Sequence, residues 1–170
     1  DGVDASLAIS DGKNNFDTID NQYFGYSKDT HEKFHELKGK IHKIEDIEKF
    51  SKELKDLERK LTLNNSTTVE VMKDRLFKKT HKKIDLVGFH GQTILHLPEK
   101  KFSLQLGDAK LLSQITNTKV VYKFRENDLK NGGQGAPLAP IFHQLLINNK
   151  NLKLPTAILN LGGIANITSV

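Results

Sequence analysis

The sequence contains no cysteine. This absence excludes disulfide bonds, thiolate catalysis and zinc sites built on cysteine, and it is typical of proteins in a reducing compartment. No apolar run reaches the roughly 18 residues that a membrane span requires, so no membrane partner is expected. The first residues also lack the basic and apolar pattern of a signal peptide. Together these absences predict a cytoplasmic chain.

Aromatic residues are scarce as well, at 7% of the sequence. The formal net charge of +5 could indicate a nucleic-acid partner, but many of the lysines lie in residues 33–83, interspersed with acidic residues on predicted helices. Interspersed charge is typical of a solvated helix face, and few aromatic side chains are available to stack on bases. No nucleic-acid partner is therefore expected.

The composition is that of a soluble globular chain, with 36% hydrophobic and 28% charged residues. A length of 170 residues suffices for one substantial core or for one lobe of a larger protein. Strand patterns come first, and strands and helices then alternate, which predicts the α/β class with a mixed sheet and packed helices. The expected strands are 1–9, one or two within 16–27, 84–89, 93–97, 102–106, 119–124 and two within 157–170.

The longest helical pattern covers about residues 30–61, where apolar residues recur at steps of three and four. The polar run 64–67 is expected to interrupt this pattern and to cap a second helix over 68–79. A coiled coil is the alternative interpretation, but such a stripe is more typical of helices lying on a sheet. Two shorter helices are expected over 109–116, capped by Asp108, and over 138–147.

The stretch 120–143 organises the rest of the chain. Charged Arg125 and Asp128 follow a predicted strand, and a turn with three glycines, 132–135, then leads into a helix. Such positions are where α/β folds bind polar ligands, and the glycines indicate positive φ angles or close backbone approach. The alternatives are a simple connecting loop and, for Arg125 with Asp128, a structural ion pair.

Two further stretches, 85–93 and 158–168, have the same layout of apolar strand, glycine and small polar residues. The three stretches together predict one site. His90, Arg125 and Asn166 are therefore expected at the rim of a common sheet.

A metal site of His90 and His96, completed by Asp108 or His143, is not expected. Their spacing is not that of a helical zinc site, and the intervening residues are strand-like. His90 is instead expected to be buried at a strand end, where its hydrogen bonds orient a loop. Asp4 and Asp128 are the first carboxylates to consider for acid-base or magnesium roles. No glycine-lysine phosphate loop or G-x-S-x-G elbow occurs.

Six motifs occur in order along the chain, and they are residues 1–4, 88–93, 104–108, 124–128, 132–138 and 160–168. Together these motifs make the chain resemble the anhydro-N-acetylmuramic acid kinase family. The resemblance implies one half of the fold shared by actin, hexokinase and the heat-shock chaperone ATPases, a ribonuclease H-like fold in which two lobes close around a nucleotide. Residues 1–170 would be the N-terminal lobe, without its first strand and without the second lobe.

The resemblance also implies a reaction of bacterial cell-wall recycling. Water opens the 1,6-anhydro ring of anhydro-N-acetylmuramic acid while ATP phosphorylates the sugar O6. The implied cofactors are ATP and Mg²⁺, and the implied partner is a small amino sugar. Such a reaction requires a general base for the water and a cation that neutralises the transferring phosphoryl group.

The resemblance also implies which residues bind the nucleotide and the sugar, and these are taken one motif at a time. Asp1, Gly2, Val3 and Asp4 resemble the end of the family's Gly-Thr-Ser-x-Asp-Gly-x-Asp phosphate-binding turn. The sugar site is expected to include His90, Gln92, Thr93, Arg125, Asp128, Gly163 and Asn166.

The family motif that carries the catalytic aspartate, Asp-Thr-Gly-Pro-Gly-Asn, does not occur within the chain. The catalytic aspartate is therefore expected beyond Val170, and no residue of the chain is assigned as catalytic. The chain alone is expected to lack kinase activity, and a second polypeptide or a homodimer is a candidate for completing it. The main alternative is a non-catalytic binding or interaction module derived from this lobe. A helical scaffold built on residues 40–80 is a further alternative.

Overall fold

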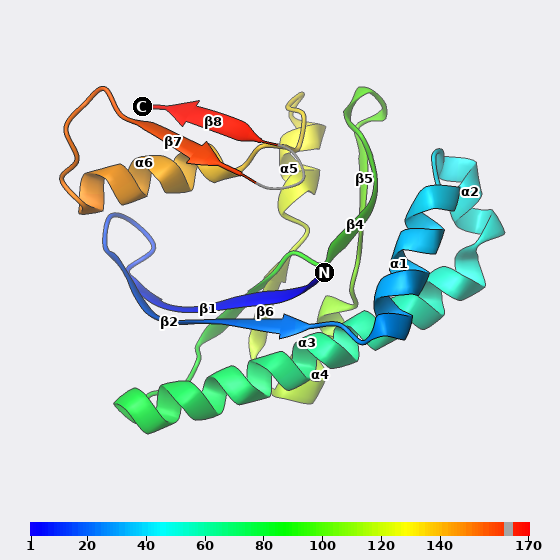
Figure 1. Cartoon of the computed structure of the whole chain (residues 1–170), viewed down its shortest axis with the longest axis horizontal. Coiled ribbons are helices and arrows are strands. Elements are labelled where there is room, and N and C mark those ends of the chain that lie inside the picture. The colour runs from blue at the N-terminus through cyan, green and yellow to red at the C-terminus, as the bar shows by residue number, and fades with distance from the viewer. Residues whose placement is uncertain (162–164) are drawn as a thin grey trace. The chain divides into compact units, whose positions relative to one another are not determined.

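The computed structural model describes residues 1–161 and 165–170 (Figure 1). The chain begins with a hairpin and three helices, continues with alternating strands and helices, and ends with a second hairpin. The elements are β1 (Gly2–Ser10), β2 (Phe16–Gly25), α1 (Lys28–Lys40), α2 (Ile44–Lys49), α3 (Ser51–Thr80), β3 (Leu86–Phe89), β4 (Gln92–Leu97), η1 (Pro98–Lys100), β5 (Phe102–Leu106), α4 (Ala109–Thr116), β6 (Lys119–Tyr122), α5 (Phe124–Lys130), α6 (Ala139–Asn149), β7 (Ala157–Asn160) and β8 (Asn166–Ser169).

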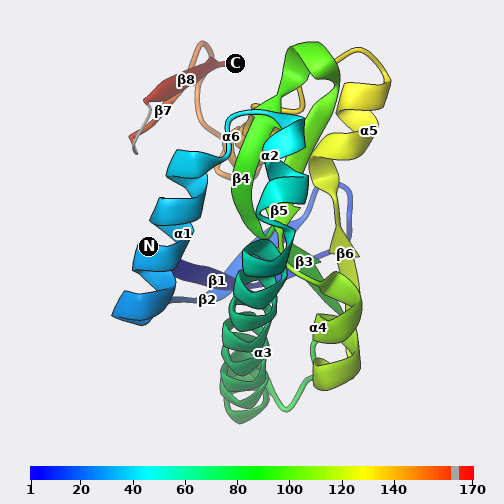
Figure 2. The same cartoon turned by 90° about the vertical axis from the view of Figure 1, so that its right-hand side faces the viewer.

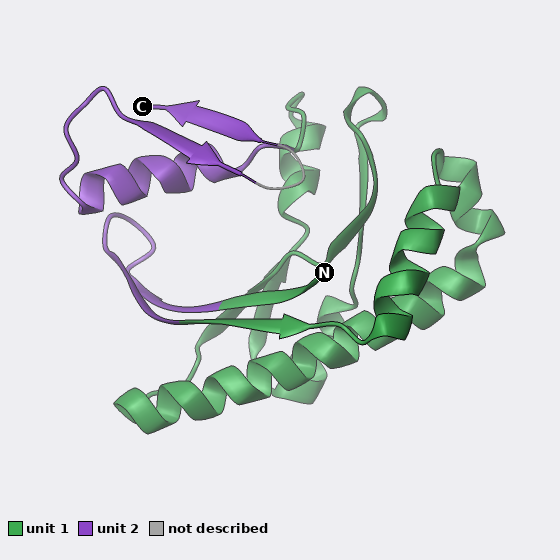
Figure 3. Cartoon of the chain, in the orientation of Figure 1, with its two compact units in different colours: residues 1–5, 21–135 green, residues 6–20, 136–170 purple. Residues whose placement is uncertain are grey.

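The chain divides into two compact units (Figure 3). Unit 1 comprises residues 1–5 and 21–135, and unit 2 comprises residues 6–20 and 136–170. The hairpin of β1 and β2 contributes its open end to unit 1 and its tip to unit 2. A backbone bond from Tyr26 N–H to the Asp1 carbonyl, 3.2 Å long, closes the open end of this hairpin.

The main core of unit 1 lies between helices and the antiparallel hairpin of β4 and β5. Helix α1 begins after Ser27, whose hydroxyl accepts the Thr30 N–H at 3.3 Å and so caps the helix. Figure 2 shows α3 and α4 side by side, and the two helices are in contact. The buried residues of this core are Phe34, Leu37, Ile41, Leu54, Leu57, Leu61, Ile94, Leu95 and Leu106.

The predicted interruption of the helix at residues 64–67 is wrong, because α3 continues through them to Thr80. The polar side chains bond to carbonyls of the preceding turn and so do not compete with the helix. Asn65 donates to the Leu61 carbonyl at 2.8 Å, and Thr67 donates to the Leu63 carbonyl at 3.2 Å. Buried apolar residues also continue on the inner face beyond this run, so packing favours one long helix.

A second, smaller core lies beside the parallel pair of β3 and β6. Its buried residues are Val69, Phe89, Ala109 and Leu112. Helix α4 covers the predicted range, and the Asp108 carboxylate accepts the N–H groups of Lys110 at 3.0 Å and Leu111 at 2.9 Å. The predicted capping role of Asp108 is therefore confirmed.

The strand predicted over 119–124 is two residues too long. Strand β6 ends at Tyr122, Lys123 has a left-handed conformation with φ of 62°, and α5 starts at Phe124. A 2.7 Å ion pair joins the Lys123 ammonium to the Glu126 carboxylate in the first turn, where a negative charge favours a helix. Arg125 and Asp128 consequently lie on a short helix and not in a loop.

The strands form four separate two-stranded sheets within residues 1–161 and 165–170, where the sequence predicts one mixed sheet. Three of the pairs join strands that are neighbours in sequence, since a short turn lets such strands pair directly. Among these described strands, only β3 and β6 are joined by a long crossover, and they are parallel. The class is α/β with small sheets and packed helices.

Unit 2 combines α6, the tip of the first hairpin and the antiparallel pair of β7 and β8. Phe16 packs edge-on against Phe142 with ring centroids 5.0 Å apart. The buried His143 places its Nδ1 atom 2.7 Å from the hydroxyl oxygen of Thr168, so helix α6 is tied to β8.

The predicted pair of strands within 157–170 is confirmed. Val170 extends the pairing by one residue beyond β8. Its N–H donates to the Thr156 carbonyl at 2.9 Å, and its carbonyl accepts the Thr156 N–H at 3.0 Å. Val170 is thus fixed by the backbone of Thr156, the residue directly before β7.

Over the described residues, no helix combines the length and apolar character needed to cross a membrane.

Candidate sugar and nucleotide sites

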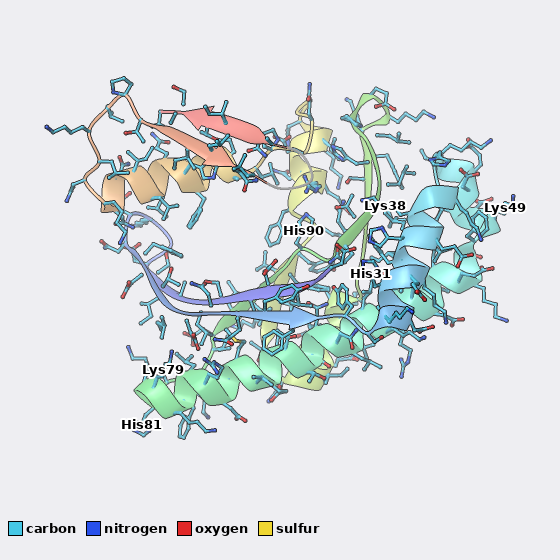
Figure 4. All side chains as sticks on the ribbon, in the orientation of Figure 1. His31, Lys38, Lys49, Lys79, His81 and His90 are labelled. Carbon is cyan, nitrogen blue, oxygen red and sulfur yellow. The ribbon has the colours of Figure 1, made fainter. Side chains whose placement is uncertain are left out.

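The parallel pairing of β3 and β6 brings together two of the predicted site residues. Phe89 lies opposite Tyr122 in the strand register, so both strands end at the same edge. His90 follows β3 directly, and Arg125 lies in the first turn of α5 after β6. The Arg125 Nε–H donates to His90 Nε2 at 3.2 Å, which makes this pair the centre of the candidate sugar site. His90 is labelled in Figure 4.

The two bonds of the His90 ring are consistent with one tautomer. Nε2 faces the Arg125 donor and must accept, while Nδ1 lies 2.8 Å from the Gly91 carbonyl oxygen and must donate. His90 thus lies at a strand end with its ring held by hydrogen bonds, as predicted. The prediction that it is buried is wrong, because the residue is exposed at the edge of the short two-stranded sheet.

Among the contacts of the described residues, Arg125 and Asp128 are linked through the backbone of Gly135 and not by a direct ion pair. The Arg125 Nη1 atom donates to the Gly135 carbonyl at 2.7 Å, and the Gly135 N–H donates to Asp128 Oδ2 at 2.7 Å. Partial burial lowers the pKa of the Arg125 guanidinium from its ordinary value, because burial disfavours the charged form. Asp128 therefore orients the loop that holds Arg125.

The glycine turn has the two properties that the sequence predicts. Gly132 and Gly135 have positive φ angles of 91° and 69°. A side chain on Gly133 would overlap the Asp128 carboxylate, and one on Gly135 would meet the buried Leu129 at 2.9 Å. Both close approaches require residues without a Cβ atom. A ligand-binding role of the turn, as against a simple connecting loop, stays a prediction.

Gln92 connects the expected sugar and nucleotide residues within unit 1. Its amide nitrogen donates to the Tyr26 hydroxyl at 3.1 Å and lies 3.4 Å from the Gly2 carbonyl. Burial raises the pKa of Tyr26, which keeps this hydroxyl protonated. Thr93, the next residue, lies in β4, and its hydroxyl oxygen is 3.5 Å from the Gln105 amide nitrogen.

The expected nucleotide residues lie at the start of β1. Gly2 passes so close to Phe24 and Tyr23 that a Cβ atom would overlap both. Val3 and Asp4 continue β1, and the Asp1 carboxylate contacts His35 on α1. The segment is thus held by the second strand and by helix α1.

Of the two carboxylates considered for magnesium, Asp4 fits a hydrated cation better than Asp128. Asp4 is exposed on β1, and an exposed carboxylate can take Mg²⁺ with most of its water ligands kept. Asp128 already accepts the Gly135 N–H and is covered by Gly133. Asp128 is thus committed to the glycine turn.

The remaining predicted residues do not join this cluster. Gly163 lies outside the described residues. Asn166 begins β8 opposite Asn160 and belongs to unit 2, whereas His90 and Arg125 belong to unit 1. The convergence of Asn166 on the other two therefore stays a prediction.

The catalytic aspartate also stays a prediction, because its expected position lies beyond Val170. Val170 itself pairs with Thr156 through two backbone hydrogen bonds in unit 2. These bonds use main-chain atoms alone, and the valine side chain offers no group for acid-base chemistry. Val170 is therefore a structural residue.

Three groups that make contacts in or near the candidate sites were not identified from the sequence. One is the Gly135 backbone, whose role no side-chain pattern could reveal. The others are His31 and His35, which lie beside Asp1. Their four-residue spacing on a predicted helix was a usable signal, because such residues share one helix face.

Comparison with known proteins gives matches to one family. The model of the family described as anhydro-N-acetylmuramic acid kinase matches residues 1–170. A protein of that name from Pelagibacter ubique is 48% identical over 170 residues, which are 100% of this chain and 44% of the relative. A protein of the same name from Gluconobacter oxydans is 38% identical over 99% of this chain and 44% of its own length. Another from Brucella canis is 36% identical over 100% of this chain and 46% of its own length. The chain thus spans less than half the length of these curated relatives.

Proposed function

Because this chain belongs to the anhydro-N-acetylmuramic acid kinase family, we propose that it is part of an ATP-dependent kinase that opens the 1,6-anhydro ring and phosphorylates O6 of that amino sugar. The observation that carries the proposal is the cluster of His90, Arg125 and Gly135 at the ends of two parallel strands. Polar ligands of α/β proteins bind at such strand ends. The product would be N-acetylmuramic acid 6-phosphate.

Residues 1–170 would form most of the N-terminal lobe of an actin- or hexokinase-like enzyme. The α/β class, the parallel crossover of β3 and β6, and the share of the relatives that the chain covers all support this assignment. In two-lobed kinases, closure around the substrates excludes water that would otherwise consume ATP. The second lobe, with the catalytic aspartate, would be supplied by the rest of the protein or by a partner chain.

Arg125 is the residue best suited to bind the sugar. A guanidinium carries five N–H donors in a planar fork, and His90 and Gly135 each take one of them. The remaining donors suit the hydroxyl and carboxylate oxygens of a muramic acid. Because Gly135 and His90 hold the guanidinium in place, little side-chain entropy would be lost on binding.

The nucleotide phosphates would bind near Asp1, Gly2, Val3 and Asp4. Asp4 would hold the Mg²⁺ that, when bound, neutralises charge on the transferring phosphoryl group. The contact of Gln92 with Gly2 would connect this segment to the sugar site, since Gln92 and His90 flank the same glycine in the chain.

Replacing Arg125 tests the sugar assignment in the intact protein. The Arg125→Ala variant should weaken binding of anhydro-N-acetylmuramic acid by at least about tenfold, because charge-assisted hydrogen bonds are lost, and should leave ATP affinity nearly unchanged. Isothermal titration calorimetry with each ligand separates the two effects. The exposed Arg59→Ala variant on α3 is the matched control.

Two results would contradict the proposal. An unchanged sugar affinity in the Arg125→Ala variant would remove Arg125 from the sugar site. Sugar binding by the intact protein without any phosphate transfer would instead favour the non-catalytic binding module.

A further inference from the structure

Two histidines on α1 and the first residue of the chain form a compact polar cluster in unit 1. His31 and His35 lie one helical turn apart, and their ring centroids are 4.4 Å from each other. The Asp1 Oδ2 atom contacts His35 Nε2 and lies 3.9 Å from His31 Nε2. Nitrogen atoms from both rings thus face one carboxylate oxygen. Figure 4 labels His31 on α1.

From this geometry we propose that Asp1, His31 and His35 form a binding site for a zinc-like divalent metal ion. One ligand atom from each residue lies within 4.8 Å of the others. A tetrahedral ion with bonds of about 2.0–2.1 Å needs ligand atoms roughly 3.3 Å apart, which small side-chain rotations can reach. Two imidazoles and a carboxylate suit Zn²⁺, whereas Mg²⁺ prefers oxygen ligands.

The ligands are held by rigid parts of unit 1. Buried Phe34, which lies between the two histidines in sequence, fixes α1 against the core. The Tyr26 N–H donates to the Asp1 carbonyl, so Asp1 is held beside the residues that lead into α1. A site built on such elements needs little ordering when the ion binds.

The cluster is also accessible to an ion from solution. The side chains of Asp1, His31 and His35 retain 40%, 46% and 50% of their exposure. Three protein ligands with this exposure leave the fourth tetrahedral position to water. The simpler alternative is that the Asp1 contact with His35 is only a hydrogen bond, and metal titration distinguishes the two.

Residues 31–35 read His-Glu-Lys-Phe-His, the pattern of helical zinc sites in which the glutamate acts as a base. Here Glu32 is 63% exposed, lies 3.8 Å from the Lys28 ammonium and is not among the three clustered ligands. The proposal is therefore confined to metal binding, and no hydrolytic activity follows from it.

The test is a calorimetric titration of the intact protein with ZnCl₂ alone. The intact protein is required because a free α-amino group at Asp1 would itself add a nitrogen ligand. His31→Ala and His35→Ala should each weaken Zn²⁺ binding by at least about tenfold, since even loss of an outer partner of a metal ligand costs that much. Co²⁺ should give visible absorption bands with the native protein that both variants lose.

Control variants keep the test decisive. His42→Ala removes another exposed histidine, and Glu32→Gln removes the nearby carboxylate, so both should bind Zn²⁺ like the native protein. His31→Gln keeps most of the side-chain volume and should also lose binding if the ring nitrogen is a ligand. Native-like Zn²⁺ affinity in a folded His31→Ala, His35→Ala double variant, or no saturable binding by the native protein, would overturn the proposal.

Discussion

The backbone of Gly135 connects the two charged side chains of the candidate sugar site. Its N–H donates to Asp128 and its carbonyl accepts from Arg125, so the position of the cation depends on the conformation of one residue. That conformation has a φ of 69°, which favours glycine. Asp128 is consequently a positioning residue.

A Gly135→Ala substitution should destabilise the protein by about 1–3 kcal/mol, because alanine is strained at this φ and its Cβ atom meets Leu129. Chemical denaturation measures the change in unfolding free energy. Gly39→Ala is the matched control, since open space surrounds Gly39 in α1 and alanine should there be neutral or stabilising. Equal stability of the two variants would contradict the assigned role of Gly135.

At the scale of elements, α3 holds the turn between β5 and α4. The Glu58 carboxylate accepts the Gly107 N–H at 3.1 Å, and the buried Thr62 hydroxyl accepts the Asp108 N–H at 2.9 Å. Asp108 in turn caps α4, which packs beside β6. This chain of contacts positions the strand from which Arg125 follows.

Removing the cap should therefore be measurable. Asp108→Ala should lower the unfolding free energy by about 1 kcal/mol, because two N–H groups in the first turn of α4 lose their acceptor. Asp108→Asn keeps an acceptor oxygen and should retain most of the stability in the same thermal or chemical unfolding experiment. A loss in the asparagine variant as large as in the alanine variant would show that capping is not what Asp108 contributes.

At the scale of the whole molecule, the predicted site residues are divided between two units. His90, Gln92, Arg125 and Asp128 belong to unit 1, and Asn166 belongs to unit 2. The chain also covers only 44% and 46% of the lengths of the relatives from Pelagibacter ubique and Brucella canis. The complete reaction would need groups beyond those of residues 1–170.

The purified 170-residue chain should accordingly show no phosphate transfer to anhydro-N-acetylmuramic acid, whereas the intact protein should show it. A coupled assay for ADP release, with the sugar phosphate identified by mass spectrometry, measures both samples under the same conditions. Sugar-dependent phosphate transfer by the isolated chain would show that residues 1–170 contain all the catalytic groups, and the expectation of an aspartate beyond Val170 would then be wrong.

Several local features could be predicted because nearby residues determine them. Strand β5 and helix α4 have the predicted bounds, since alternation and the Asp108 cap act over a few residues. Two wrong predictions also have local causes. The predicted break in α3 is absent because the polar side chains bond within the helix, and the predicted strand is too long because β6 ends before Lys123. The His31 and His35 spacing was visible in the sequence, but their metal-site geometry depends on Asp1.

The sequence by itself determined the family motifs, the helix caps and the glycines that a tight turn requires, because these depend on residue type and short spacing. Only the tertiary structure decided which distant groups meet. His90 contacts Arg125 across 35 positions, and Asp1 contacts His35 across 34. Such contacts follow from the pairing of β3 with β6 and from the packing of α1, which are cooperative properties of the folded chain and leave no short-range pattern.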